Sequence, residues 1–232
     1  MLMPYYSIGS EAGKIEKYLT AEFLQNFRPV FVVHPGMKVP VILPENPGKI
    51  DTACWGIAGR AGHHLPWLEA AGTVKNKYRM LIRKQRCLIP ANGFFVQYAG
   101  KHYFIYFPED PVFTLGGLFT CLHDNHDRAT GFTFSTLIRE SPPAFRKISP
   151  VLPVIISKSS RRRYLNHSKP LMDITHMLQK EIKLNFNGIE ISPVIFSKKN
   201  PEASDFSRTA FRLFPTHKFP EKEIMGTYFF YQ

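Results

Sequence analysis

The stretch RCLIPANGFFVQ, residues 86–97, decides how the rest of the chain is interpreted. It begins with an apolar run at 87–89 and continues through Pro90 into Asn92-Gly93, a dipeptide that favours positive φ and tight turns. The aromatic and β-branched residues after Gly93 favour a second strand. The sequence therefore predicts two buried strands joined by a turn at Asn92-Gly93, with Pro90 ending the regular hydrogen bonding of the first strand.

The segments on either side of this stretch add more strands and few helices. Runs rich in aromatic and β-branched residues predict strands at 102–107, 112–119, 132–138 and 189–195, and residues 151–156 are expected to form a buried apolar segment. Residues 11–27 place apolar side chains on one face at helical spacing, so we expect an amphipathic helix there. Residues 67–86 are expected to be helical in part. Because no repeat or linker divides the chain, this pattern indicates a single α+β domain over residues 1–232.

Composition excludes several classes of protein. No apolar run approaches the roughly 20 residues that a membrane-spanning helix needs, and no secretory signal is visible at the start. The three cysteines, Cys54, Cys87 and Cys121, are scattered and odd in number, which favours reduced thiols in a cytoplasmic protein. They show no metal-ligand spacing, so we expect neither a metal nor another cofactor.

The net charge of +12 is the informative bulk property. An excess of this size suits a polyanionic partner, of which nucleic acid is the first candidate and an anionic membrane surface the second. A protein that is basic without such a partner is the alternative. The densest positive cluster precedes the central stretch, at residues 75–86, where it forms either a solvated helix face or a face that contacts phosphates.

In the order and spacing of several short motifs, the chain resembles the SOS-response-associated peptidase (SRAP) family, the abasic-site processing proteins. The resemblance rests on these motifs: WGI at 55–57, RCLIPANGFF at 86–95, FTLGGLF at 113–119, TFSTLI at 133–138, LPVII at 152–156 followed by YL at 164–165, and SPV at 192–194 with NP at 200–201. The resemblance implies a SRAP-like domain of antiparallel-rich, twisted, barrel-like sheets with a few flanking helices.

The family also implies a chemistry. A cysteine that follows the initiator methionine closes a ring on the aldehyde of an abasic site in single-stranded DNA, through its thiol and its α-amine, and so crosslinks protein to DNA. The same thiol is the nucleophile for cleavage of a leading segment. An Asn and an Arg hold the lesion, and a Glu and a His supply acid–base catalysis.

This sequence departs from the family at each of those positions. The chain begins MLMP, and the positions of the family's cysteine, glutamate and histidine fall at Pro4, Val96 and Ser149, or at Arg146 in place of Ser149 under another gap placement. Residues 68–74, which match the Asn and Arg region, contain neither residue type. We therefore expect no intact catalytic residue and a catalytically degenerate member of the family.

Three hypotheses follow. The first is a degenerate SRAP-like protein that still binds single-stranded DNA, abasic or intact, as its partner. Its candidate DNA-binding residues are Trp55, Arg60, Trp67, Lys75, Lys77, Arg79, Arg83, Lys84 and Arg86. The second is an active crosslinker in which translation starts at Met3 and the secondary amine of Pro4 attacks the aldehyde to form an iminium ion. The third is a scaffold that kept the fold and lost DNA binding.

Overall fold

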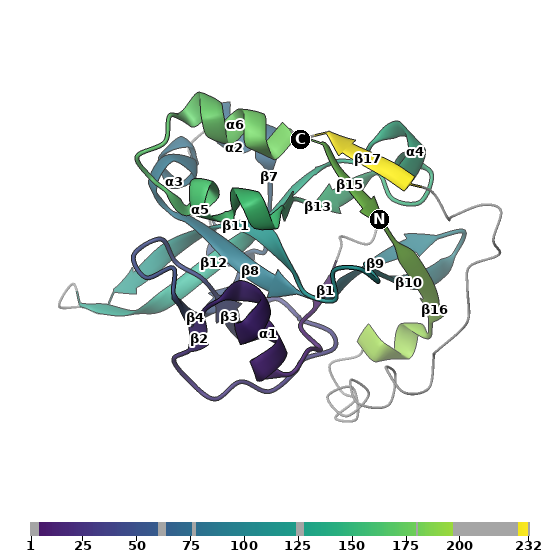
Figure 1. Cartoon of the computed structure of the whole chain (residues 1–232), viewed down its shortest axis with the longest axis horizontal. Helices are drawn as coiled ribbons and strands as arrows, with labels where there is room; N and C mark the ends of the chain where they lie inside the picture. The colour runs from purple at the N-terminus through teal and green to yellow at the C-terminus, as the bar shows by residue number, and fades with distance from the viewer. Residues whose placement is uncertain are drawn as a thin grey trace.

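The chain folds into two main sheets, with α2 (Ala70–Lys75), α3 (Arg79–Lys84), α5 (Arg161–Leu165) and α6 (Leu171–Gln179) grouped at one end and α1 (Ala12–Leu19) and α4 (Pro143–Arg146) elsewhere (Figure 1). The computed structural model describes residues 5–59, 64–75, 78–123, 128–179, 181–196 and 227–231. The architecture is a single α+β domain rich in strands, as the sequence predicts. Within the described residues neither sheet closes into a barrel, because each sheet ends in edge strands.

The larger sheet has nine strands, and its longest pair is β11 (Phe113–His123) with β12 (Ala129–Glu140). The strand order is β14-β11-β12-β4-β2, with β14 (Ile155–Ile156), β4 (Lys49–Trp55) and β2 (Glu22–Phe23). Four further strands pair off this path: β8 (Arg86–Ala91) on β11, β3 (Lys38–Val41) on β4, and both β7 (Trp67–Glu69) and β13 (Val151–Pro153) on β12.

The smaller sheet has four strands in the order β1-β9-β10-β16, all antiparallel to their neighbours. These are β1 (Tyr6–Ser7), β9 (Gly93–Tyr98), β10 (Lys101–Tyr106) and β16 (Asn187–Ile191). Two short pairs stand apart, β5 (Ile57–Ala58) with β6 (His64–Leu65) and β15 (Glu181–Asn185) with β17 (Thr227–Tyr231). The strands predicted from sequence at 102–107, 112–119, 132–138 and 189–195 therefore all contain strand, although the last ends at Ile191, and the apolar segment at 151–156 contains β13 and β14.

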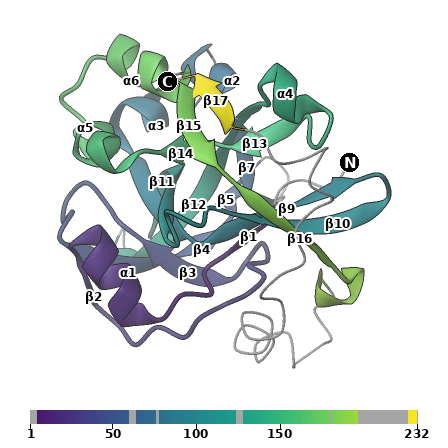
Figure 2. The same cartoon turned by 45° about the vertical axis from the view of Figure 1, so that its right-hand side comes forward.

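The helices are short. They are α1 (Ala12–Leu19), α2 (Ala70–Lys75), α3 (Arg79–Lys84), α4 (Pro143–Arg146), α5 (Arg161–Leu165) and α6 (Leu171–Gln179), with single-turn 3₁₀ helices η2 (Lys158–Ser160) and η3 (Pro193–Phe196). Helices α3, α5 and α6 lie together at the end of the molecule away from β9 and β10 in both views (Figure 2). The helix predicted over 11–27 is shorter than expected, because Thr20 turns left-handed at φ 55° and residues 22–23 pair with β4.

The stretch 86–97 forms two strands, but the predicted turn between them is wrong. Strand β8 pairs with β11 in the larger sheet, whereas β9 pairs with β10 and β1 in the smaller one, so the chain passes from one sheet to the other at Asn92. Pro90 does not end the ladder, since it lies opposite Thr114 within β8. The two-residue hairpin turn is instead Ala99-Gly100, where both residues have positive φ, 48° and 78°.

Gly93 is required for space rather than for positive φ. A Cβ atom at Gly93 would lie 2.2 Å from ring carbons of Phe104 and 2.7 Å from the carbonyl oxygen of Ile105. Asn92 holds the same junction against the start of the chain: its amide donates to the Ser7 carbonyl at 3.0 Å, and its side-chain oxygen accepts from the amide of Gly9 at 2.7 Å. The dipeptide that suggested a turn is therefore the crossing point between the sheets.

The core lies between the two sheets, and β9 shows how it is divided. Phe94 and Val96 face the main cluster together with Leu115 of β11 and Phe134 of β12, whereas Phe95 joins a smaller cluster on the other face of the four-stranded sheet. This is the alternation expected of a strand that is buried on both faces. No helix in the described residues is long and apolar enough to cross a membrane.

Candidate nucleic-acid interface

Arg86, a predicted DNA-binding residue, lies in the interior and binds the backbone of two helices. Its side chain is 1% exposed. Nε donates to the carbonyl of Tyr164 at 2.5 Å, Nη1 donates to those of Ile82 and Arg83 at 2.5 and 2.6 Å, and Nη2 donates to that of Asn166 at 2.7 Å. The guanidinium thus satisfies carbonyls at the C-terminal ends of α3 and α5, where positive charge is favoured. Arg86 is a structural residue, and the prediction that it contacts phosphate is wrong.

Helix α3 carries exposed cations on one side, and its other side packs against the core. Ile82 is fully buried, whereas Arg79, Arg83 and Lys84 are exposed and form what we call the α3 basic face. Because Arg86 binds the last turn of α3 directly, the backbone that carries these three side chains is fixed. This arrangement suits contact with a sugar–phosphate backbone, in which point charges on a rigid element match a line of phosphates.

The structure says less about the other cations predicted to bind DNA. Arg60 and Lys77 lie outside the described residues, and Lys75 is the last residue of α2. Helix α5 adds Arg162 and Arg163 as exposed cations. Arg163 forms an exposed ion pair with Asp173 at 2.9 Å.

The two tryptophans are in contact but differ in exposure. Trp55 is fully buried, its indole N–H donates to the Pro66 carbonyl at 2.8 Å, and its ring packs against Tyr6 and Trp67 with centroid distances of 4.8 and 5.1 Å. A base cannot stack on Trp55 in this position, so the prediction for this residue is corrected. Trp67, on β7, is half-buried.

Trp67 belongs to a cluster of half-buried aromatic side chains that pack around Tyr5, the first residue that the structure describes. Tyr5 lies at its centre, with ring centroids 5.6 Å from His34, 6.0 Å from Trp67 and 5.6 Å from Phe196. We call these four residues the N-terminal aromatic cluster. Sequence reasoning found only Trp67, because the other members come from distant segments and share no spacing.

At the positions where the resemblance places the family's glutamate and histidine, the structure has neither a carboxylate nor an imidazole. Val96 is 1% exposed and lies in the main core. Ser149 is 5% exposed, and its hydroxyl donates to the carbonyl of Val151 at 2.7 Å. Arg146, the alternative position, is exposed and 3.9 Å from Glu140. Pro4 lies outside the described residues.

Of these positions, Val96 lies next in the chain to a residue that bonds to the N-terminal aromatic cluster. The amide of Phe95, beside Val96, donates to the carbonyl of Tyr5 at 2.8 Å. Strands β7 and β13 both pair with β12, and Ile138 has Glu69 and Pro153 as its two neighbours. Trp67 and the segment that follows Ser149 are therefore held on the same central strand.

The thiols of Cys87 and Cys121 are unsuited to nucleophilic chemistry in this state. Cys87 is fully buried, and burial raises the pKa of its thiol far above the usual range. Cys121 is partly exposed, and desolvation with the nearby Glu45 also raises its pKa. Among the described residues, no three His, Cys, Asp or Glu side chains gather in a way that would hold a metal ion.

Comparison with known proteins agrees with this fold. The family model described as SOS response associated peptidase (SRAP) matches residues 5–197. A solved protein from Bacteroides thetaiotaomicron superposes with a TM-score of 0.70 at 18% identity, covering 85% of this chain and 96% of its own. A protein from Bordetella bronchiseptica superposes with a TM-score of 0.66 at 15% identity, covering 82% of this chain and 100% of its own. A phage-related protein from the same organism has a TM-score of 0.61 at 14% identity, covering 82% of this chain and 94% of its own. Curated proteins gave no match.

Proposed function

The chain belongs to the SOS response associated peptidase (SRAP) family, and on that premise we propose that it binds single-stranded DNA in the response to abasic sites without performing the family's covalent chemistry. Family membership is the reason for proposing an abasic site as the DNA lesion. The observation that carries the proposal for this chain is the α3 basic face, three exposed cations on a helix whose last turn is fixed by a buried guanidinium.

The N-terminal aromatic cluster supplies the second part of the proposed interface. Stacking of a base on an exposed aromatic ring contributes about 1–3 kcal/mol and tolerates any base sequence. Trp67 and Tyr5 are half-buried rather than enclosed in the core, which suits such contact. Trp67 therefore remains in the proposed interface, together with Arg79, Arg83 and Lys84, whereas the buried Trp55 and Arg86 do not.

The proposed lack of chemistry rests on the residues at the family's catalytic positions. Acid–base catalysis requires a group that gains or loses a proton near the reacting atom, and neither Val96 nor the Ser149 hydroxyl does so near neutral pH. Val96 is also closed off by the main core. The competing proposal, amine chemistry at Pro4, needs the mature chain to begin at that residue.

A salt titration of binding to single-stranded DNA tests the proposal. Each phosphate contact contributes a slope of about −0.7 in log affinity against log salt concentration on single strands. Replacing Arg79, Arg83 and Lys84 with Gln should weaken binding and make the slope shallower by about 2, because three contacts are removed. A matched control replaces three other exposed cations, Lys14, Lys17 and Arg28, with Gln and should change the slope little.

The outcomes separate the hypotheses. Equal losses in the two triple variants would mean that binding follows net charge alone, and absence of salt-dependent binding would favour the scaffold hypothesis. Incubation with an oligonucleotide that contains an abasic site, followed by denaturing electrophoresis with and without borohydride, tests the chemistry. We expect no DNA adduct that survives denaturation. A borohydride-trapped adduct on a chain that begins at Pro4 would establish the iminium mechanism instead.

A further inference from the structure

A second polar site lies away from the N-terminal aromatic cluster, in a cavity of about 590 Å³. Its walls come from the end of α1, from the loop that connects β3 to β4, and from η2 and α5, and its floor includes Ile42 and Leu88. Cavities of about 300–1,000 Å³ that combine apolar walls with a few polar groups are the usual form of small-molecule sites.

Arg161 lines this cavity and has unused hydrogen-bonding capacity. Its side chain is 8% exposed, Nε donates to the Thr114 hydroxyl at 3.2 Å, and Nη1 donates to the carbonyl of Tyr18 at 3.4 Å. Nη2 is buried and has no hydrogen-bond partner in the part of the chain that the structure describes. A buried guanidinium N–H without an acceptor is unusual, because buried donors are nearly always satisfied by protein, water or ligand.

Further cations surround the same cavity. The Lys158 ammonium lies 5.6 Å and the Arg161 guanidinium 4.5 Å from the centre of the Tyr18 ring. Arg162 and His167 also line the cavity and are exposed. Of the lining residues in the described ranges none is Asp or Glu, and the neighbouring Asp110 accepts the hydrogen bond of the Tyr18 hydroxyl at 3.0 Å. The side chains that line the cavity therefore carry a net positive charge.

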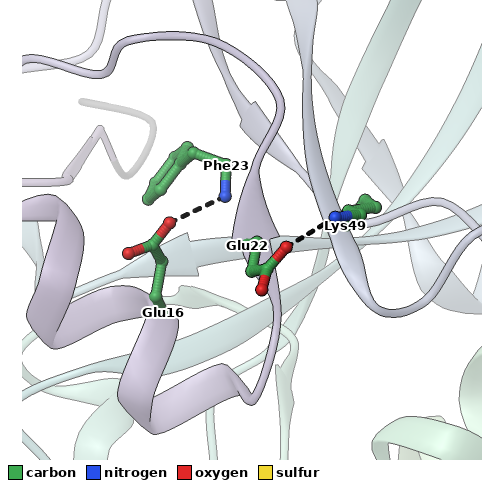
Figure 3. A network of polar contacts seen from close by, with 4 residues as sticks. All are labelled: Glu16, Glu22, Phe23 and Lys49. Atoms are coloured by element: carbon green, nitrogen blue, oxygen red, sulfur yellow. Dashed lines mark hydrogen bonds and ion pairs between the residues drawn. The ribbon is translucent and has the colours of Figure 1, made fainter.

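The wall opposite α5 is held in place by a polar network (Figure 3). After the left-handed Thr20, the Glu16 carboxylate accepts a hydrogen bond from the amide of Phe23 at 2.9 Å, and Glu22 pairs with Lys49 at 2.5 Å. The amide of Glu22 also donates to the carbonyl of Gly48, a lining residue, at 3.0 Å. These contacts join the end of α1 to the β3–β4 loop, so the two walls form one preorganised surface.

We propose that this cavity binds a phosphate monoester carried on a small organic group of about mononucleotide size. A dianionic phosphate presents three acceptor oxygens, which match the exposed Lys158 ammonium and Arg162 guanidinium, with the Arg161 guanidinium beside them. The Tyr18 ring and the apolar floor provide surface for the organic group. The proposal is independent of DNA binding at the α3 basic face, since no residue of that face lines the cavity.

Calorimetry with thymidine 5′-monophosphate tests the proposal, with thymidine and inorganic phosphate as separate arms. We expect saturable binding of the monophosphate and at least tenfold weaker binding of thymidine, since the phosphate provides the charge-assisted bonds. Inorganic phosphate should compete, but bind more weakly than the monophosphate. The double variant Lys158→Gln/Arg162→Gln should weaken monophosphate binding at least tenfold; both positions are exposed, so the fold is retained.

The matched control is Arg163→Gln, which removes a neighbouring exposed charge that does not line the cavity. Its affinity for the monophosphate should equal that of the wild type, as should that of the α3 triple variant. An equal loss in Arg163→Gln, or binding of thymidine as tight as that of the monophosphate, would overturn the proposal. Equal affinity for inorganic phosphate and the monophosphate would show an adventitious ion only.

Discussion

The Nε atom of Arg86 donates a hydrogen bond to the backbone carbonyl of Tyr164 at 2.5 Å, across 78 residues of chain. The same guanidinium reaches the last turn of α3. A single buried cation thus joins the helix that carries the α3 basic face to α5, which lines the cation-lined cavity. The two proposed sites are built on backbones that share one anchor.

Arg86→Met should reduce the free energy of unfolding by at least about 3 kcal/mol, because it leaves several buried carbonyls without their charged donor. Arg86→Lys should recover only part of the loss, since an ammonium cannot reproduce the planar fork. Urea denaturation measures both values. Arg83→Met removes an exposed guanidinium one turn away and is the control, with an expected change below about 0.5 kcal/mol. Similar values for the two Met variants would contradict the anchoring role.

Intrinsic fluorescence should report DNA binding through Trp67 alone. The chain has two tryptophans, and Trp55 is fully buried whereas Trp67 is half-buried beside Tyr5. A stacked base quenches the indole that it touches, so single-stranded DNA should quench wild-type protein and Trp55→Phe, but not Trp67→Phe. Quenching that persists in Trp67→Phe would remove this residue from the interface.

Gly93→Ala should destabilise the protein by about 1–3 kcal/mol, the range typical of overpacking in a core. The added Cβ would meet the ring of Phe104 at 2.2 Å and the backbone oxygen of Ile105 at 2.7 Å. Gly131→Ala is a suitable control, because a Cβ there has nothing within 4 Å. Thermal or urea unfolding of the two variants checks the difference, and a neutral Gly93→Ala would show that the sheet junction can widen at little cost.

Alkaline pH should weaken the fold through Cys87. Burial raises the pKa of this thiol in the folded state far above its ordinary value of 9.0. The folded protein therefore keeps a proton that the unfolded chain loses, so the stabilisation is complete below pH 9.0 and declines as pH rises above it, by up to about 1.4 kcal/mol per pH unit.

Comparison with Cys87→Ala isolates this effect from other groups that titrate at high pH. The variant is expected to be less stable than wild type at pH 7, because it leaves a small cavity, and to lose less stability between pH 9 and 10. Equal slopes for the two proteins across that interval would contradict burial of the neutral thiol.

The sequence predicted the elements better than their connections. Aromatic and β-branched runs identified the strands that became β10, β11 and β12, because such patterns report local preference and burial. They did not reveal that β8 and β9 belong to different sheets. Strand partners are chosen by contacts far along the chain, and Asn92-Gly93 fits a turn and a close crossing equally well from composition alone.

In the candidate site, likewise, the sequence predicted some residues correctly but not the contacts that bury others. Exposure of the α3 cations agrees with the charge cluster seen in the sequence, since such residues are rarely buried. Arg86 belonged to that cluster by sequence, yet it is buried because carbonyls from α3 and α5 converge on it. Trp55 was likewise indistinguishable from Trp67 in sequence. The cation-lined cavity had no sequence signal, because its lining residues come from four separate segments.

The passage of residues 86–97 from one sheet to the other has a consequence for how the protein opens. The Asn92 amide is bonded to Ser7, and the Phe95 amide is bonded to Tyr5, so the junction is closed by the start of the chain as well. Separating the sheets would expose the main cluster that packs between them, including Phe94 and Val96 of β9. The two sheets should therefore behave as one cooperative unit in hydrogen exchange, with amide protons at the junction exchanging only when the whole domain unfolds.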